Sequence, residues 1–255
     1  MLLAAYTLWL REIVRFYRQR SRVVGALGTP LVFWFLIGSG LGQSFQAGPG
    51  VPLQGGYLEY FYPGTLALIL LFTAIFSTIS IIEDRQEGFL QGVMVAPVPR
   101  SAIVLGKILG GTTLAVIQGV IFLALAPFAH VHLSLARLPA LAFLLVGVSF
   151  GLTGLGFVIA WMFDSTQGFH AIMNLVLFPM WILSGALFPA AGAAGWVRAL
   201  MLINPLTYGV TGLQQVLLTH APAWPSLDVC LAVVGGFAVA MIAAGGTVVA
   251  RKGTA

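Results

Sequence analysis

The sequence predicts an all-α integral membrane protein with six transmembrane helices. Of its 255 residues, 59% are hydrophobic and only 7% are charged, whereas a soluble domain carries about a quarter charged residues. Several charge-free apolar runs are close to the ~20 residues that a helix needs to cross a bilayer. Helices are expected because hydrocarbon cannot hydrogen-bond an unpaired backbone. No polar linker or repeat divides the chain, so we expect one membrane domain over residues 1–255.

Residues 1–22 are expected to form an amphipathic helix that lies on the membrane surface. Aromatic and aliphatic side chains occupy one arc of its helical projection, and four arginines form a narrow stripe on the opposite arc. Arginines beside lipid phosphates, with aromatic rings at the acyl boundary, would hold the helix flat on the cytoplasmic leaflet. The helix therefore either anchors the first span or grips a partner subunit. Its charge follows the apolar residues and no small-residue cleavage site is present, so we expect no removable signal peptide. The stripe consists of Arg11, Arg15, Arg18 and Arg22.

Six charge-free segments are expected to cross the membrane. With a cytoplasmic N-terminus, ten of the twelve basic residues fall on the inner side and only Arg137 and Arg198 fall outside. The positive-inside rule therefore favours cytoplasmic N- and C-termini in a bacterial-type inner membrane. The expected spans are residues 23–41, 60–82, 108–129, 138–163, 171–188 and 229–250.

The fourth expected span carries four glycines on a smooth side. Small residues let helix backbones approach closely, which indicates packing against another helix of the same subunit. These glycines are Gly147, Gly151, Gly154 and Gly156.

Residues 190–220 are largely apolar, yet they are not expected to cross completely. Asn204, Pro205 and Tyr208, followed by the pair Gln214 and Gln215, would be awkward facing lipid. A full crossing would also place the basic C-terminal end outside. We expect broken helices that enter the outer face and return.

A charged segment, residues 83–100, interrupts the apolar sequence between the second and third spans. Acidic residues one turn apart are expected at the N-terminal end of a short helix, which Pro97 and Pro99 must end. Its apolar side has no core of its own, which favours a docking surface for a soluble cytoplasmic partner. An inert connecting loop is the alternative. The candidate docking residues are Glu83, Asp84, Glu87, Phe89, Leu90 and Met94.

The segment that begins at Glu87-Gly88 and continues FLQGVMVAPVPRSAIVLGKILG resembles a segment of type-2 ABC transporter permeases. Three further segments resemble that family in order and spacing, so the resemblance covers most of the chain. Phe89 and Gln91 stand where Thr and Glu are common, and Gln214 stands where a basic residue is common. The further segments are YFYPGTL at 60–66, PMWILSGALFP at 179–189 and NPLTYGVTGL at 204–213.

The resemblance implies one half of an exporter. Two permease chains, identical or different, would form the pathway, and two ATP-hydrolysing subunits would bind residues 83–100 from below. It implies that this chain has no catalytic residue and holds no cofactor, with ATP and Mg²⁺ on the partner subunit. The pair Gly106-Lys107 agrees, because it lacks the upstream glycines of a phosphate-binding loop. The expected cargo is an amphipathic drug, lipid or lipid-linked glycan.

Other chemistry is less well supported by the sequence. His130 and His132 lack a third metal ligand nearby, and Asp164, Ser165 and His170 lie in a turn where polar residues are ordinary. The net charge of +5 has no soluble domain on which to bind nucleic acid.

Two other functional classes remain as alternatives, an ion-coupled carrier or channel and an intramembrane enzyme. Ionisable side chains lie in loops or near span ends, which counts against proton or cation coupling. Backbone carbonyls could still bind sodium. No convergent nucleophile, acid and base stand out for an enzyme.

Overall fold

The computed structural model describes residues 2–41, 56–131, 133–219, 221–222 and 224–252, and these residues form helices and turns without a strand. Within these described residues, six helices are long and apolar enough to cross a membrane, which confirms the predicted class and number of spans. They are α2 (Arg20–Gly40), α3 (Gly56–Gln86), α5 (Arg100–Leu123), α6 (Leu138–Met162), α7 (Thr166–Trp181) with the π turn that continues it to Ala186, and α10 (Leu227–Lys252). The shorter helices are α1 (Leu2–Arg18), α4 (Phe89–Val95), α8 (Gly195–Ile203) and α9 (Pro205–Leu217).

Helix α3 is the centre of the bundle. It contacts α2, α5, α6, α7 and α9, and almost all of its side chains are buried. Aromatic rings fill the space around one part of it: Tyr62 stacks on Phe122 with ring centroids 4.6 Å apart, and Trp34 meets both rings edge-on. The helix therefore forms the buried core that most of the other helices share.

Helices α6 and α10 pack closely through the predicted glycines. A Cβ atom at Gly147 would lie 2.6 Å from a methyl of Val234, and one at Gly154 would lie 2.7 Å from Met241 Cβ. Gly151 meets Phe237 of α10, whereas Gly156 faces Thr78 of α3. The expectation that these glycines serve packing within the subunit is confirmed.

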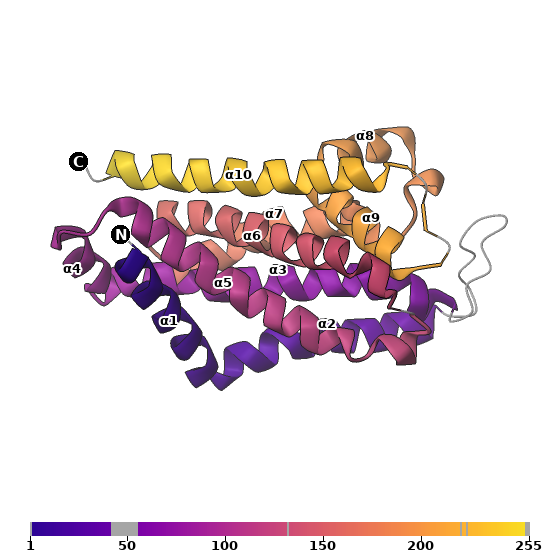
Figure 1. The fold of residues 1–255 in the computed structure, drawn as a ribbon, viewed down its shortest axis with the longest axis horizontal. Coiled ribbons are helices and arrows are strands. Elements are labelled where there is room, and N and C mark those ends of the chain that lie inside the picture. Colours follow the sequence, from indigo (N-terminus) through magenta and orange to yellow (C-terminus); the bar gives the residue numbers. More distant parts are fainter. Residues whose placement is uncertain (1, 42–55, 132, 220, 223, 253–255) are drawn as a thin grey trace.

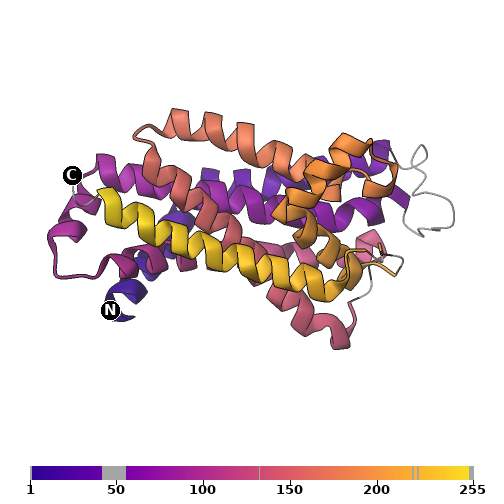
Figure 2. The same cartoon turned by 90° about the horizontal axis from the view of Figure 1, so that it is seen from above.

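The short elements gather at opposite ends of the bundle (Figures 1 and 2). Helix α4, the start of α1 and the end of α10 lie at one end. Helices α8 and α9 lie at the other end, and each is shorter than the ~20 residues that cross a bilayer. We call these the α4 end and the α8–α9 end. His220, the last residue of the expected outer segment, lies outside the described residues.

Several predicted boundaries differ from the observed ones. The expected surface helix over residues 1–22 ends at Arg18, and Arg22 belongs to α2. The third span was expected to reach residue 129, but α5 ends at Leu123 and a 3₁₀ turn (Ala126–Ala129) follows. Pro127 explains this end, because proline has no N–H for a continuing α-helix.

The charged segment 83–100 contains parts of three helices rather than one short helix. Its first four residues form the last turn of α3, its centre forms α4, and Arg100 begins α5. Gly88 separates α3 from α4 with φ of 77°, in the left-handed region that favours glycine. Glu83 and Asp84 therefore lie at the C-terminal end of α3 and not at the start of a short helix.

Candidate functional site

Helix α4 is a short exposed helix at the end of the bundle. Its apolar residues divide between two sides: Leu90 is buried against the bundle, whereas Met94 and Val95 are exposed, Val95 to 87%. Phe89 is half-buried, and the Arg11 guanidinium lies over its ring, 3.7 Å from the centroid. The helix thus presents apolar side chains outward while two of its residues fix it to the rest of the molecule.

Helix α1 lies directly on α5 because two glycines leave room for it. A Cβ atom at Gly106 would lie 2.7 Å from Leu8 Cβ, and one at Gly110 would lie 2.7 Å from Glu12 Cβ. This close approach brings the acidic side chain of Glu12 to Lys107, whose Nζ lies 2.6 Å from Glu12 Oε1.

Eight charged side chains from α1, α2, α5, the end of α3 and the turn that follows α3 form one cluster, which we call the charge cluster. Asp84 is at its centre: its carboxylate accepts two hydrogen bonds from Arg11, at 2.6 and 2.8 Å, and also contacts Arg15 and Lys107. Arg15 continues to Glu83 at 2.9 Å and to Glu87 at 3.2 Å. The members are Arg11, Glu12, Arg15, Arg22, Glu83, Asp84, Glu87 and Lys107.

The cluster is electrically neutral, with four carboxylates and four cations. The side chain of Asp84 is 0% exposed, and those of Glu12 and Lys107 are nearly so. Hydrogen bonds to Asp84 raise the pKa of Arg11 above its ordinary value. Removing one partner from such a buried set leaves an uncompensated charge, which typically costs about 3–5 kcal/mol. The cluster therefore holds α1 to the ends of α3 and α5 as one unit.

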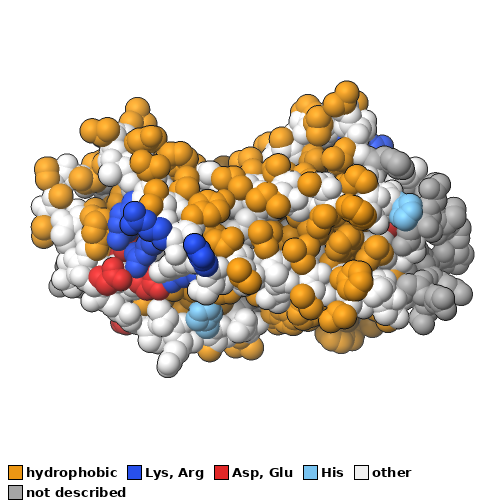
Figure 3. Space-filling view, turned by 90° about the horizontal axis from the view of Figure 1, so that it is seen from below, with side chains coloured by type: hydrophobic (Ala, Val, Ile, Leu, Met, Phe, Trp, Pro, Cys, Tyr) orange, Lys and Arg blue, Asp and Glu red, His pale blue; other side chains and the backbone are white. Residues whose placement is uncertain are grey.

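Figure 3 shows this arrangement from below. Basic and acidic side chains gather side by side toward the α4 end, and hydrophobic side chains cover much of the remaining face.

The arginine stripe faces a different neighbour from the one expected. Three of its members, Arg11, Arg15 and Arg22, point to carboxylates of α3 rather than to lipid phosphates, while Arg18 is exposed. The opposite face of α1 exposes large apolar side chains, among them Tyr6 and Tyr17. The carboxylates at the end of α3 lie close to the stripe, and the attraction between opposite charges is greater where water is excluded.

The predicted docking residues do not all lie on one surface. Asp84 and Leu90 are buried, Glu83 is held by Arg15 and Arg22, and Phe89 lies under Arg11. Exposed are Glu87, Met94 and one residue absent from the prediction, Val95. A groove of about 520 Å³ between α1 and α4 adds Leu3, Thr7 and Val93 to this surface.

Sequence reasoning also missed two buried members of the charge cluster, Glu12 and Lys107. Glu12 is the one acid among the basic residues of α1, and Lys107 is the one cation within an otherwise uncharged stretch of α5. An isolated charge inside an apolar helix requires a partner, and that signal was present for Lys107. For Glu12 the signal was a single acid between arginines.

The polar turn between α6 and α7 has structural contacts. Arg85 donates to Asp164 at 2.6 Å and to the carbonyl oxygen of Trp161 at 2.9 Å, and Ser165 caps α7 by accepting from the Gly168 amide. Among the described residues no three potential metal-ligating side chains converge. His132 lies outside the described residues.

A second feature lies at the α8–α9 end, where α7 breaks. The helix passes into a π turn (Ile182–Ala186), and Gly185 has φ of 85°. The break exposes carbonyl groups: Gly185 O accepts from Tyr60 at 2.8 Å and from Gln214 at 3.3 Å. Thr207 donates to Leu183 O at 3.2 Å. Gln214, which departs from the family pattern, thus helps to hold the broken helix.

The predicted residues of the outer segment join α8 and α9 to α7. Asn204 Oδ1 accepts from the Leu206 amide at 3.0 Å and caps α9, while its Nδ2 donates to Met180 O at 2.6 Å. Pro205 is the first residue of α9, a position that does not need its missing N–H. Tyr208 donates to Leu202 O at 2.9 Å, back in α8.

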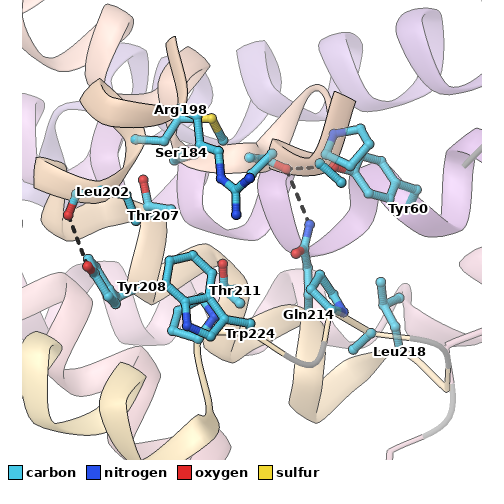
Figure 4. Close-up of a pocket in the computed structure, with 18 of the residues that line it drawn as sticks. Tyr60, Ser184, Arg198, Leu202, Thr207, Tyr208, Thr211, Gln214, Leu218 and Trp224 are labelled. Carbon is cyan, nitrogen blue, oxygen red and sulfur yellow. Dashed lines mark hydrogen bonds between the residues drawn. The ribbon is translucent and has the colours of Figure 1, made fainter. Parts of the chain in front are cut away.

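These elements surround a cavity of about 670 Å³, which we call the outer cavity after the expected outer segment that lines it. Figure 4 shows Arg198 of α8 pointing into it, between Ser184, Gln214 and Trp224. Apolar side chains make up most of the lining, and the volume is in the range of small-molecule sites.

Comparisons with known proteins agree with this architecture. The family model described as ABC-2 type transporter matches residues 4–218. Nodulation protein J of Rhizobium leguminosarum bv. trifolii is 28% identical over 87% of this chain and 82% of the relative. The putative transport permease ycf38 of Cyanophora paradoxa is 25% identical over 80% of this chain and 71% of the relative. The probable multidrug ABC transporter permease YbhR of Escherichia coli K12 is 26% identical over 72% of this chain and 52% of the relative.

Proposed function

This chain belongs to the ABC-2 type transporter family, and on that premise we propose that it is the membrane subunit of an exporter whose energy comes from ATP hydrolysed by a separate subunit. Two copies, or this chain and a similar one, would form the complete pathway. ATP and Mg²⁺ would bind to the partner, and the cargo would be an amphipathic drug, lipid or lipid-linked glycan.

The observation that carries this proposal is the geometry of α4. A short helix that exposes Met94 and Val95 beside the groove on α1 offers a compact apolar surface to a soluble protein. Its other side is fixed by Leu90 and by the stacking of Arg11 on Phe89. A force on α4 therefore reaches the charge cluster directly.

The charge cluster would transmit that force from α4 and α1 to the long helices. Its ion pairs join α1 to the end of α3 and to α5, and α3 in turn contacts α7 and α9. When ATP draws two partner subunits together, α4 would shift and these helices would move as one body. The movement would then reach the α8–α9 end and alter the route by which the cargo leaves the membrane.

The orientation follows from the same proposal. The α4 end would face the cytoplasm of a bacterial-type cell, and with it the start of α1 and the end of α10. The exposed apolar face of α1 would lie on the lipid of the inner leaflet or against the partner.

The test compares two exposed apolar residues at opposite ends. Val95→Asp places a charge on the docking surface, and Leu135→Asp makes the same change at a residue that is 84% exposed near the start of α6. We expect Val95→Asp to reduce about tenfold the amount of ATPase subunit that copurifies with the chain. A tenfold change in affinity corresponds to ~1.4 kcal/mol of binding free energy. Leu135→Asp should retain the ATPase subunit. Equal recovery from both variants would exclude α4 as the docking helix.

A further inference from the structure

The outer cavity changes in polarity from its floor to its mouth. Tyr60, Met201, Gln214 and Leu218 line it and are buried. Arg198 and Trp224 line it as well, but both are exposed. A ligand that matches this cavity has one apolar part and one polar part.

The polar donors on the floor of the cavity are already hydrogen-bonded within the protein. The Tyr60 hydroxyl and the Gln214 amide both donate to Gly185 O. Ser184 likewise donates to Trp181 O, at 2.5 Å. These donors are already used to hold the broken end of α7, so what remains for a ligand on the floor is mainly apolar contact.

Among the described residues that line the mouth, Arg198 is a cation without an acidic partner. None of the ion pairs that the described residues form includes Arg198, although the guanidinium lies over the Trp224 ring, 6.0 Å from its centroid. Arg137, the other arginine expected at this end, donates to Gln215 O at 2.9 Å. Arg198 is therefore the cation that faces the cavity.

We propose that the outer cavity binds an amphiphile with an anionic headgroup. Its phosphate or carboxylate group sits at Arg198, which offers several donors to such an anion. Its apolar chain enters between Met201, Leu218 and the edge of Trp224. A free inorganic anion leaves the floor unfilled, and a neutral amphiphile leaves the guanidinium without a partner.

The same chemistry has two possible sources. One is a lipid of the adjoining leaflet, whose headgroups lie at the level where exposed tryptophans such as Trp196 and Trp224 are typical. The other is a transported amphiphile that leaves the pathway at this end. The site goes beyond the proposed permease function and requires no ATPase for its test.

The test uses the purified full chain in a neutral maltoside detergent, with lysophosphatidylglycerol and lysophosphatidylcholine as probes. The two probes can share one acyl chain and differ in net charge. Titrations followed by calorimetry should show that the wild type binds the anionic probe about tenfold more tightly than the zwitterionic one, about 1.4 kcal/mol. Inorganic phosphate alone should bind far more weakly than either.

Three variants separate headgroup, chain and general effects. Arg198→Gln should lose the preference for the anionic probe and still bind both weakly. Ala190→Trp, which places a large ring into the lining, should weaken both probes together. Arg137→Gln, the matched control, should keep the wild-type preference. A preference that survives Arg198→Gln, or probe affinities unchanged by Ala190→Trp, would overturn the proposal.

The source is then tested in nanodiscs. Dodecyl phosphate is added to the chain in discs of phosphatidylcholine alone or with phosphatidylglycerol. Competition by phosphatidylglycerol supports the site with a membrane lipid as its occupant. Undiminished binding of dodecyl phosphate supports the site with a soluble or transported amphiphile. Absence of Arg198-dependent binding in both discs counts against the site itself, and it leaves the proposed docking at α4 untouched.

Discussion

Asp84 is the residue on which the charge cluster depends most. It meets three cations from two helices, Arg11 and Arg15 of α1 and Lys107 of α5, and its side chain is fully buried. Replacing its charge leaves these cations close together without a central anion, in a place from which water is excluded.

Asp84→Asn should therefore lower the free energy of unfolding by about 3–5 kcal/mol. Thermal unfolding of the purified chain in detergent measures the change. Asp164→Asn is the matched control, because Asp164 also pairs with an arginine but is 80% exposed, so its loss should cost no more than about 1 kcal/mol. Similar unfolding temperatures for the two variants would show that the cluster does not hold the helices together.

Sequence reasoning singled out six members of the cluster, but it missed Glu12 and Lys107 and did not reveal how the members pair. The arginines of the stripe and the acids near Glu83 are recognisable separately, by helical spacing on α1 and by their place in an apolar chain. They are more than 60 residues apart, so no local spacing rule connects them. The outcome that the stripe turns toward protein rather than lipid follows from the close packing of α1 on α5, which rests on Gly106 and Gly110.

At the scale of elements, the join between α3 and α4 depends on Gly88. Its φ of 77° is costly for any residue with a Cβ, and no neighbouring atom lies within 4 Å of the place that a Cβ would occupy. A side chain at this position would therefore strain the backbone but would clash with no neighbouring atom.

Gly88→Ala should accordingly destabilise the chain by about 1–2 kcal/mol. Gly92→Ala, inside α4 and also with open space around it, should instead be neutral or stabilising by up to about 1 kcal/mol, because alanine favours a helix. Chemical or thermal unfolding of both variants gives the two signs. If both variants changed the stability equally and with the same sign, the left-handed conformation of Gly88 would be contradicted.

Elements were predictable where the chain itself interrupts a helix. Pro97 and Pro99 end α4, and Asn204-Pro205 divides α8 from α9, as the sequence indicated. The break in α7 at Gly185 was not predicted, because Ser184-Gly185 interrupts the apolar run only weakly. What fixes that break is tertiary: the side chains of Tyr60 and Gln214 bind the carbonyl group that it frees.

At the scale of the whole molecule, the number of spans was predictable but their arrangement was not. A bilayer requires long apolar helices, and the apolar runs that form them can be recognised directly in the sequence. Helices α3 and α10 are both strongly apolar, yet α3 is almost entirely buried and α10 is largely exposed. Hydropathy cannot separate them, because lipid is as apolar as a protein core.

The proposed orientation predicts which end each side of the membrane can reach. Cys230 is buried, so it is a poor target for a thiol reagent. In intact cells a membrane-impermeant maleimide should label Leu135→Cys and leave Val95→Cys unlabelled. Labelling of both after the membrane is opened shows that each thiol is accessible. Labelling of Val95→Cys in intact cells would place the α4 end outside.

The central claim, that α4 is the contact through which a separate ATPase moves this chain, is tested most directly by identifying what touches Val95 in the native membrane. A photo-cross-linking residue at position 95 should capture a subunit with a nucleotide-binding domain, and the same residue at position 135 should not. Capture of no ATP-binding protein at position 95, or capture of the ATPase at position 135, would contradict the account.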